Sequence, residues 1–350
     1  MKRYVVTGGA GFIGSALCHL LLSESDAEVV AVDRMTYAAN QVTLDELSSQ
    51  AGFRHIDADV RDVARMTEIV QSVKPGVVFH LAAETHVDRS IDGPAEFVTT
   101  NVVGTYAMLE AARTYWSDLP DEAKQHFRFV HISTDEVFGS LGAEGHFSET
   151  TPYDPSSPYS ASKAGSDHLA RAWQRTYGLP VVVSNCSNNY GPRQFPEKLI
   201  PLMVLNALEG KALPVYGTGT NVRDWLHVED HARALKMMAE HGVPGEVYCV
   251  GGGSERTNLQ IVHEVCRILD ARRPENAPHA DLIEFVTDRP GHDFRYAIDA
   301  SKIDTKLGWT PRQDFEAGLE ETIDWYLTHE AWWRPLRDKH YSGERLGVKA

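Results

Sequence analysis

A glycine-rich turn near the start of the chain limits most strongly what this sequence can fold into. The apolar run Arg3–Thr7 predicts a β-strand, and the segment Gly8-Gly9-Ala10-Gly11-Phe12-Ile13-Gly14 leads from it into a helical pattern. It fits G-x-G-x-x-G from Gly9 and GxxGxxG from Gly8. Glycines at this spacing permit a tight turn and let backbone N–H groups and a helix N-terminus approach a pyrophosphate. The turn therefore predicts a dinucleotide-binding βα unit.

Short apolar runs alternate with longer helical patterns through the first half of the chain. The runs predicted as strands are Arg3–Thr7, Glu28–Asp33, Phe53–Asp57, Val77–Ala82, Phe127–Ser133 and Pro180–Asn185. The predicted helices are Phe12–Ser23, Val63–Val73, Pro94–Trp116 and Ser157–Tyr177. Strands separated by helices imply right-handed crossovers and a parallel sheet covered on both faces. The expected fold class is α/β, a Rossmann-like doubly wound parallel sheet.

The pattern changes near residue 190, where the strict alternation stops and Gly/Pro-rich turns separate shorter elements. Helical patterns return at Leu199–Leu208, His231–Glu240, Asn258–Leu269 and Phe315–His329. We expect residues 1–190 to form the dinucleotide-binding domain. Residues 191–350 should form a smaller substrate-binding lobe at the carboxyl ends of the strands, where ligands bind in such sheets. This boundary is approximate, because elements after residue 190 can rejoin the sheet.

The composition disfavours several other classes of protein. The 350 residues are 42% hydrophobic and 24% charged, which is the balance of a globular enzyme. A formal net charge of −15 argues against a nucleic-acid partner. No apolar stretch approaches the roughly 20 residues that span a bilayer, and the early glycine turn leaves no space for a signal peptide. We expect a cytoplasmic protein without a membrane partner.

The cysteines and histidines do not predict a metal site. Cys18, Cys186, Cys249 and Cys266 lie far apart and form no CxxC pair, so buried free thiols are expected. His227 and His231 stand at i and i+4 with Glu229 between them, but a zincin helix needs the order H-E-x-x-H. The sequence therefore predicts no metal.

An acidic residue at the end of the second strand completes the dinucleotide motif. Asp33 lies 19 positions after Gly14, where a carboxylate can accept both ribose hydroxyls and would repel a 2′-phosphate. This favours NAD, although the neighbouring Arg34 is of the kind that accommodates NADP. Asp59 ends another strand-like run, and two interpretations of it stay open: contact with the adenine edge, or a cap for the next helix.

A second cluster of polar residues predicts chemistry on an alcohol. Tyr159 and Lys163 share one helix face, and an ammonium beside a phenol stabilises the phenolate that removes a proton as hydride leaves carbon. Thr134, at the end of a predicted strand, can bind the same oxygen. Asp135 and Glu136 follow it and form either a solvated acidic turn or an acid/base pair. In the second case, oxidation at a sugar C4 acidifies the C5 proton, one carboxylate removes that proton, and the other protonates the leaving C6 hydroxyl.

Motifs along nearly the whole chain resemble the dTDP-glucose 4,6-dehydratases, which are extended members of the short-chain dehydrogenase/reductase family. The motifs are TGGAGFIGS at 7–15, HLAAETHVDRSI at 80–91, TNVVGT at 100–105, STDEVFGS at 133–140, YSASK at 159–163, SNNYGP at 187–192, PEKLIP at 196–201, GTGTNVRDWLHVEDH at 217–231 and RPGHDFRYAID at 289–299. Thr85 and Phe138 depart from the family pattern, where serine and tyrosine are expected. The resemblance implies a lyase that converts dTDP-glucose to its 4-keto-6-deoxy derivative.

The same resemblance assigns residues to three groups. The catalytic set is Thr134, Asp135, Glu136, Tyr159 and Lys163, with Tyr159 as base for the 4-hydroxyl, Glu136 as base at C5 and Asp135 as acid at the C6 oxygen. The NAD set is Gly8, Gly11, Phe12, Ile13, Gly14, Asp33, Arg34, Met35, Thr36, Asp59, Val60, Leu81, Ala82, Ala83, Thr85, Thr100, Tyr159, Lys163 and Asn189. The substrate set is Glu84, Thr134, Asn188, Lys198, Leu199, Pro214, Val215, Tyr216, Arg223, Asn258, Arg289, Pro290, Gly291, His292 and Asp293. Relatives also form homodimers through the helices that correspond to Pro94–Trp116 and Ser157–Tyr177.

Two other functions compete with this interpretation. A nucleotide-sugar 4-epimerase uses the same tyrosine and NAD but returns hydride to C4, so it has no need of Asp135 and Glu136. A non-catalytic NAD-sensing module would keep the glycine turn without a reason to keep Tyr159 and Lys163. The choice between thymine and uracil as the nucleotide base stays open.

Overall fold

The computed structural model describes residues 2–23, 26–289, 291–341, 343 and 346. Its described residues contain a seven-stranded sheet with the order β10-β6-β5-β4-β1-β2-β3, and every neighbouring pair in it is parallel. The strands are β1 (Lys2–Thr7), β2 (Ala27–Asp33), β3 (Phe53–Asp57), β4 (Val77–His80), β5 (Arg128–Thr134), β6 (Val181–Cys186) and β10 (Val247–Val250). The doubly wound α/β fold is confirmed. β10, which lies beyond residue 190, forms one edge of the sheet.

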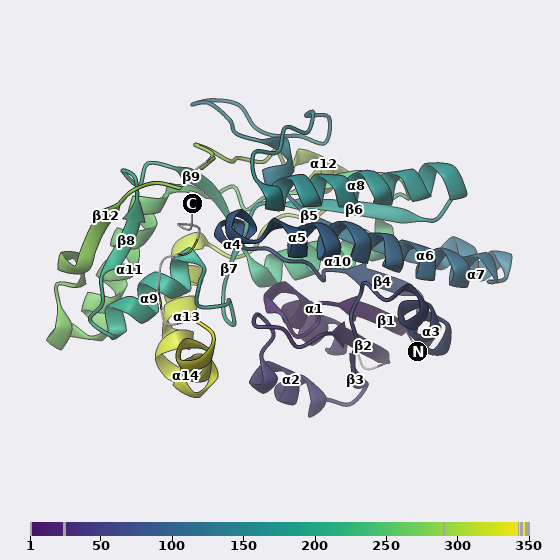
Figure 1. Ribbon diagram of the computed structural model, residues 1–350, viewed down its shortest axis with the longest axis horizontal. Helices are drawn as coiled ribbons and strands as arrows, with labels where there is room; N and C mark the ends of the chain where they lie inside the picture. The colour runs from purple at the N-terminus through teal and green to yellow at the C-terminus, as the bar shows by residue number, and fades with distance from the viewer. Residues whose placement is uncertain (1, 24–25, 290, 342, 344–345, 347–350) are drawn as a thin grey trace.

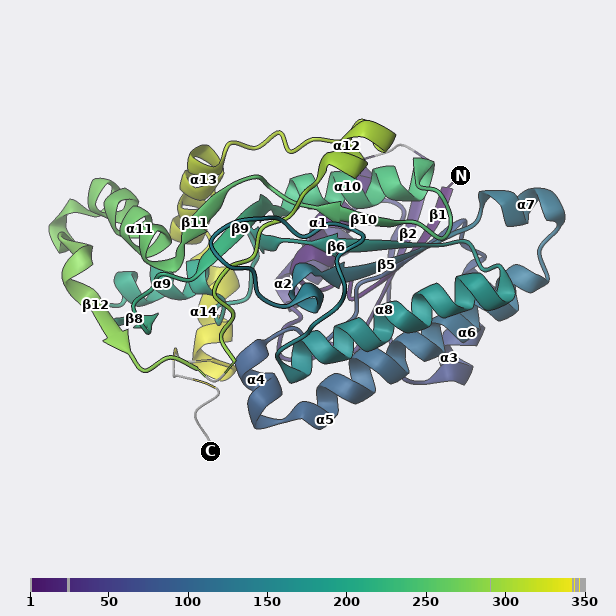
Figure 2. The ribbon, with the colours of Figure 1, turned by 90° about the horizontal axis from the view of Figure 1, so that it is seen from above.

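Helices cover both faces of this sheet (Figure 2). One face carries α3 (Val63–Val73), α6 (Gly104–Ser117) and α8 (Pro158–Tyr177), and the other carries α1 (Phe12–Leu22), α10 (Val228–His241) and α12 (Ser301–Leu307). Side chains alternate across each strand. In β1, Tyr4 and Val6 join the core beneath α1 and α10, whereas Val5 joins the core beneath α3, α6 and α8. Strands that are buried on both faces appear in the sequence as continuous apolar runs. For this reason the predicted strands lie close to the observed ones.

One predicted helix is interrupted. The segment Pro94–Trp116 was expected to be a single helix, but it consists of α5 (Pro94–Phe97), a π-helical turn over Val98–Val103, and α6. The π-helical turn contains several β-branched residues, which lose side-chain freedom in a helix. A π-turn within a helix is frequent at functional sites. Here the turn presents Thr100 to the cavity described below.

A second lobe lies beside the sheet, on the left in Figure 1. It contains the strands β7 (Asn188–Tyr190), β9 (Val222–His227) and β11 (Glu255–Thr257), and the pair β8 (Leu213–Tyr216) and β12 (Ile283–Val286). Its helices are α9 (Leu199–Leu208), α11 (Asn258–Arg272), α13 (Phe315–Thr328) and α14 (Glu330–Lys339). These elements share an apolar core of their own, which includes Ile200, Val265 and Tyr326.

Short helices complete the described chain. They are α2 (Gln41–Ser48), α4 (Val87–Asp92), α7 (Asp121–His126) and the 3₁₀ turns Asp135–Phe138, Pro274–Asn276 and His279–Leu282. The four cysteines are free and buried, as predicted. In the part of the chain that the structure describes, no helix combines the length and the apolar character needed to cross a membrane.

Candidate active site

Two cavities meet at the carboxyl ends of the parallel strands. The first, with a volume of about 310 Å³, extends from the glycine turn to α8, and the second, of about 190 Å³, lies against the second lobe. Five residues line both: Thr85, Glu136, Asn188, Glu197 and Lys198. The first cavity begins between β1 and β4, where the strand order reverses, which is the place where open α/β sheets bind ligands. The two cavities form one cleft.

The glycine turn is shaped by close backbone contacts. Gly8 has a φ of +74°, and a Cβ there would lie 2.9 Å from the amide nitrogen of Ala82. A Cβ on Gly14 would collide with the carbonyl oxygen of Gly8. Gly11 is the N-cap of α1 and supplies no side-chain hydrogen bond. The first amides of α1 are therefore open to an anionic ligand in the cavity.

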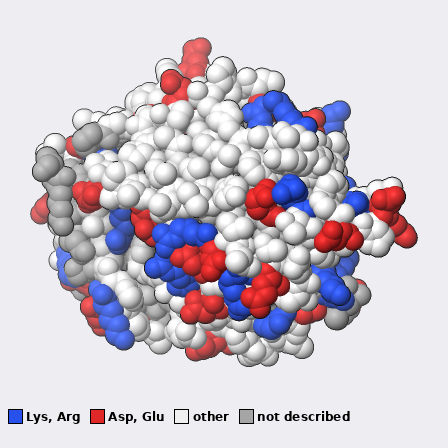
Figure 3. Space-filling view, turned by 45° about the vertical axis from the view of Figure 1, so that its right-hand side comes forward, with Lys and Arg blue, Asp and Glu red and all other residues white. Residues whose placement is uncertain are grey.

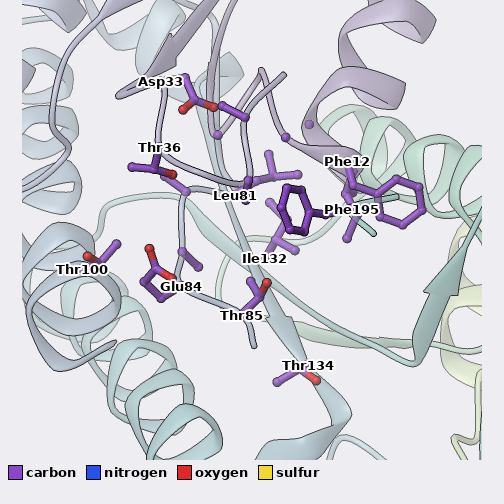
Figure 4. A pocket seen from close by; sticks show the side chains of 18 of the residues that line it. Phe12, Asp33, Thr36, Leu81, Glu84, Thr85, Thr100, Ile132, Thr134 and Phe195 are labelled. Atoms are coloured by element: carbon purple, nitrogen blue, oxygen red, sulfur yellow. The ribbon is translucent and has the colours of Figure 1, made fainter. Parts of the chain in front are cut away.

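Nearly all residues predicted to bind the cofactor line the first cavity. Those in its wall are Gly8, Gly11, Phe12, Ile13, Gly14, Asp33, Arg34, Thr36, Asp59, Val60, Leu81, Ala82, Ala83, Thr85, Thr100, Tyr159, Lys163 and Asn189. Figure 4 shows Asp33 and Thr36 at one end and Thr134 at the other. Met35 is not part of this wall, and its backbone N–H donates to Asp33 Oδ1 at 3.2 Å. Phe195, Ile132 and Ser133 also line the cavity, although sequence reasoning did not single them out.

Asp33 and Asp59 hold the loops at the outer end of this cavity. Asp33 Oδ2 accepts the N–H of Ala10 at 3.0 Å, which joins the end of β2 to the glycine turn. Asp59 accepts hydrogen bonds from Arg61 and from Arg34, the latter at 3.0 Å. The interpretation of Asp59 as a helix cap is wrong, because the Asp62 side chain caps α3. Arg34 is half exposed, and its guanidinium is engaged by Asp59.

Tyr159 and Lys163 enter the cleft from the first two turns of α8. The N-terminus of this helix is well stabilised, because Pro158 stands at its first position and Ser157 and Ser160 form a capping box. Lys163 Nζ donates to the carbonyl oxygen of Ile132 at 2.8 Å, which fixes its position beside β5. Burial raises the pKa of Tyr159 well above its usual value, and Glu136 raises it further. Burial lowers the pKa of Lys163.

Asp135 and Glu136 form the turn that follows β5. The Thr134 hydroxyl donates to Asp135 Oδ1 and accepts the N–H of Glu136, each at 3.2 Å. Burial raises the pKa of Asp135 well above its usual value, and Glu136 adds to this rise. Burial also raises the pKa of Glu136, but Arg289, Arg223 and Lys198 oppose that effect. The turn therefore holds two carboxyl groups in different surroundings: three cations act on Glu136, whereas the neighbouring carboxylates Glu136 and Asp224 act on Asp135.

The second cavity collects most of the residues predicted to bind substrate. Its wall includes Asn188, Lys198, Leu199, Pro214, Val215, Tyr216, Arg223, Asn258, Arg289 and His292, whereas Glu84 and Thr134 line the first cavity. Gly291 and Asp293 lie outside both walls, and the Asp293 carboxylate accepts the hydroxyls of Ser156 and Tyr296. Pro290 lies outside the described residues.

Three cations reach the second cavity, and one of them is held by a carboxylate that sequence reasoning missed. Lys198, Arg223 and Arg289 all line it. Arg289 Nη1 donates to Asp88 Oδ1 at 2.6 Å, and the Tyr216 hydroxyl donates to Asp88 Oδ2 at 3.1 Å. Asp88 lies within the HVDRSI motif, which could have signalled it, yet its partner Arg289 is 201 positions away. Leu202, Met203, Trp225 and Val262 supply the apolar wall that was also missed.

Two other sequence features have structural roles away from this chemistry. His227 caps the N-terminus of α10, and His231 Nδ1 lies 2.9 Å from Asn189 Oδ1. Among the described residues, no group of three or more His, Cys, Asp or Glu side chains could hold a metal ion. Phe138 is buried and stacks on Phe147 with ring centroids 5.2 Å apart, so an apolar ring fits this position.

A doubly wound sheet with a phosphate-binding glycine turn, a Tyr-x-x-x-Lys helix and a second lobe over the cleft defines an extended short-chain dehydrogenase/reductase. The family model described as GDP-mannose 4,6 dehydratase matches residues 5–322. A relative from Sinorhizobium fredii named "Probable dTDP-glucose 4,6-dehydratase" is 58% identical over 346 residues, which are 99% of each chain. The chain belongs to the nucleotide-sugar 4,6-dehydratase family, and within it to the dTDP-glucose 4,6-dehydratases.

Solved structures agree with this assignment. The dTDP-glucose 4,6-dehydratase DesIV of Streptomyces venezuelae, crystallised with NAD bound, has a TM-score of 0.88 and 42% identity, and the match covers 96% of this chain and 100% of that one. A UDP-glucose 4-epimerase of Thermotoga maritima has a TM-score of 0.82 and 28% identity over 93% of this chain and 99% of its own. The fold is common to both activities, so the residues of the cleft must distinguish them.

Proposed function

We propose that this chain converts dTDP-glucose to dTDP-4-keto-6-deoxyglucose by removing one water molecule, with NAD as its resident cofactor. The observation that carries the proposal is the place of Glu136, in the wall that the two cavities share, between the Tyr159–Lys163 pair and the cations of the second lobe. A sugar held there has its ring between the cofactor cavity and a cavity fit for a nucleoside diphosphate. The relatives' names and the NAD bound to DesIV support the same assignment.

The first cavity fits NAD on three counts. Its glycine turn leaves no room for a Cβ on Gly14, the N-terminus of α1 is free for a pyrophosphate, and Asp33 stands where a ribose diol would lie. When bound there, NAD would accept a hydride from C4 of the sugar and return it to C6. The resident cofactor would therefore be regenerated in each turnover.

The chain's own residues divide the proton transfers among them. Tyr159 takes the proton of the C4 hydroxyl, and the Lys163 ammonium beside it favours the phenolate. Glu136, whose charge is favoured by three cations, removes the C5 proton. Burial raises the pKa of Asp135, which favours its protonated form, and Asp135 is the proposed donor of a proton to the departing C6 oxygen. Lys198, Arg223 and Arg289 would bind the diphosphate through charge-assisted hydrogen bonds.

The unlike carboxyl pair favours this function over 4-epimerisation. An epimerase oxidises and reduces the same carbon, so it has no elimination step to catalyse. Incubation of the purified protein with dTDP-glucose, without added cofactor, should give a product lighter by one water in a mass spectrum. An unchanged mass with formation of dTDP-galactose would instead establish the epimerase.

We also propose that the protein works in the cytoplasm as a homodimer. Val98, Val103 and Tyr106 on the π-turn and α6, and Tyr177 on α8, are large exposed hydrophobic side chains. Figure 3 brings this side of the molecule forward and shows a broad face with few charged side chains. Val103→Glu should convert a dimer to a monomer in light scattering, whereas Val243→Glu, at a valine exposed elsewhere, should not. A monomeric wild-type protein would refute the dimer.

The two lobes would divide the binding of the two ligands. Residues 1–190, joined by α10 and β10, would hold NAD, and most of residues 191–350 would hold the nucleotide. The second cavity supports this division, because its cations at positions 198, 223 and 289 all come from the later part of the chain.

A further inference from the structure

A buried carboxylate lies on α8 one helical turn beyond Lys163. Asp167 follows Lys163 at i+4, so the two side chains lie on the same helix face. Asp167 has no exposed surface, and Lys163 is 5% exposed. An isolated charge in such a place would be costly, so this carboxylate needs partners.

Several hydrogen-bonding groups surround the Asp167 carboxylate. Among the described residues, Ser133 donates to its Oδ2 at 2.8 Å, Tyr153 at 2.9 Å and Asn185 at 3.2 Å, and His131 Nε2 lies 2.9 Å from its Oδ1. Burial alone raises the pKa of Asp167, but the hydrogen bonds and charges around it bring the pKa below its usual value. Donors on both oxygens hold this group in its ionised form.

The hydrogen bond from His131 and the positive charge of Lys163 both favour the ionised form of this carboxylate. The imidazoles on the neighbouring strands, His131 and His80, are fully buried, and burial lowers the pKa of both, so they are neutral at neutral pH. Cys186 lies near Lys163, and burial raises the pKa of its thiol to about 12, which keeps the thiol neutral. For Lys163 itself, burial lowers the pKa, whereas Asp167 acts in the opposite direction. Tyr159 also lies on this face of α8, and burial raises the pKa of its phenol well above the usual value, so it carries no charge at neutral pH.

Asp167 also connects α8 to the end of β5. Ser133 and His131 reach the carboxylate from β5 itself. Asn185 on β6 donates both to Asp167 Oδ2 and, at 3.1 Å, to the carbonyl oxygen of Thr134. The residue that precedes the Asp135–Glu136 turn is thus tied to the helix that carries Tyr159.

We propose that Asp167 is a positioning residue for the reaction. It keeps the Lys163 ammonium charged and holds the helix that carries Tyr159 and Lys163 in place against the Asp135–Glu136 turn. The inference rests on the proposed function, because it concerns the base that acts at C4. It assigns to Asp167 no contact with the sugar or with NAD.

The test measures the charge of Lys163 directly. Protein that retains its NAD is labelled with ¹³C at the lysine ε-carbon, the Lys163 signal is assigned with Lys163→Arg, and its chemical shift is followed against pH. In the wild type the ammonium should persist throughout the neutral range. Asp167→Asn should move the Lys163 titration to lower pH by about one unit or more, because a nearby opposite charge has been removed. Tyr153→Phe removes one donor and keeps the carboxylate, so it should leave that titration nearly unchanged.

Three results would overturn the proposal. A neutral Lys163 amine at neutral pH in the wild type would do so even if Asp167→Asn failed to fold. The proposal would also be overturned if folded Asp167→Asn showed the same Lys163 titration as the wild type. Equal shifts of this titration in Asp167→Asn and Tyr153→Phe would overturn it as well. Because these measurements use no sugar, they stand apart from the dehydration assay. With dTDP-glucose present, the rate at which bound NAD is reduced should fall as the pH is raised and Lys163 loses its proton. In Asp167→Asn this fall should begin at a lower pH than in the wild type.

Discussion

Asp135 and Glu136 are adjacent in the chain, yet Glu136 lines the cleft where its two cavities meet and Asp135 lies behind that wall with 1% of its surface exposed. Two carboxyl groups on one 3₁₀ turn thereby acquire different surroundings. Lys198, Arg223 and Arg289 favour the charged form of Glu136 and Asp293 opposes it. Asp135 has the acidic neighbours Glu136 and Asp224 and is also influenced by Arg223. This difference supports the proposed roles of Glu136 as a base and Asp135 as an acid, and it leads to the first two predictions.

Glu136→Gln should stall the reaction after the first oxidation. The amide cannot accept the C5 proton, so turnover should fall by roughly a hundredfold to ten-thousandfold, the usual contribution of a general base. Tyr159 and Lys163 are unchanged, and bound NAD should still be reduced in a single turnover, visible in its near-ultraviolet absorbance. Full turnover by this variant would contradict the role given to Glu136.

Asp135→Asn should block a later step and leave exchange at C5 intact. With Glu136 present, the C5 proton of the oxidised sugar can leave and return, so deuterium from D₂O should enter C5 while water loss is slow. Mass spectrometry of the recovered sugar nucleotide measures this exchange, and Glu136→Gln provides the comparison in which it should be absent. Equal exchange in both variants would show that the two carboxyl groups are not divided as proposed.

Gly14→Ala should damage cofactor binding because the new Cβ would collide with the carbonyl oxygen of Gly8. Crowding of this kind in a packed site costs about 1–3 kcal/mol. We expect less NAD to co-purify with the variant and a lower melting temperature. Gly142→Ala is a matched control, because a Cβ at Gly142 would meet nothing within 4 Å. Normal NAD content in Gly14→Ala would mean that the turn can widen without loss.

His231 should make the fold sensitive to acid. It is fully buried against Asn189, and burial lowers its pKa to about 3. The unfolded chain takes up a proton near the ordinary value of 6.5, so stability is retained above that pH and lost as the pH falls toward 3. His231→Asn should reduce the loss of unfolding free energy between about pH 7.5 and about pH 5 by about 2 kcal/mol.

Urea unfolding at the two pH values measures that difference. His263 on α11 is exposed, and His263→Asn is therefore the control that should leave the pH dependence as it is in the wild type. If His231→Asn loses as much stability on acidification as the wild type, the buried imidazole is not a source of the acid sensitivity.

The sheet and the first cavity followed from local sequence patterns. Strand β3 and helix α3 were predicted at their observed bounds, because a buried strand and an amphipathic helix each carry their own periodicity. The glycine turn, Asp33 and Tyr159 could also be predicted, since strand order in a doubly wound fold brings the carboxyl ends of the strands to one edge.

The second cavity depended on contacts that no local pattern contains. From the sequence alone, Asp88 is an ordinary acidic residue in the first turn of a helix. Its role becomes visible only in the fold, where Arg289 and Tyr216, from distant parts of the chain, bind its carboxylate. Met203 and Val262 read as core residues of amphipathic helices, and only the packing of α9 against α11 leaves them facing a cavity. The π-turn at Val98–Val103 was not predicted, because the spacing of its hydrophobic residues is the same as that expected for a continuous α-helix.

Asp88 should set the affinity for the nucleotide through Arg289. It holds the guanidinium at 2.6 Å, with 4% of its own surface exposed, so Arg289 is fixed in the wall of the second cavity before a ligand arrives. Removing one charge-assisted hydrogen bond costs about 1.5–3 kcal/mol, so Arg289→Met should weaken dTDP binding roughly tenfold to a hundredfold in calorimetry. Asp88→Asn keeps the Arg289 guanidinium but no longer holds it in place. This variant should lose less affinity for dTDP than Arg289→Met, and the loss should raise KM and leave kcat unchanged. Arg267→Met, at an arginine paired on the exposed side of α11, should bind dTDP as the wild type does. Equal affinity in all three variants would place the diphosphate elsewhere in the cleft.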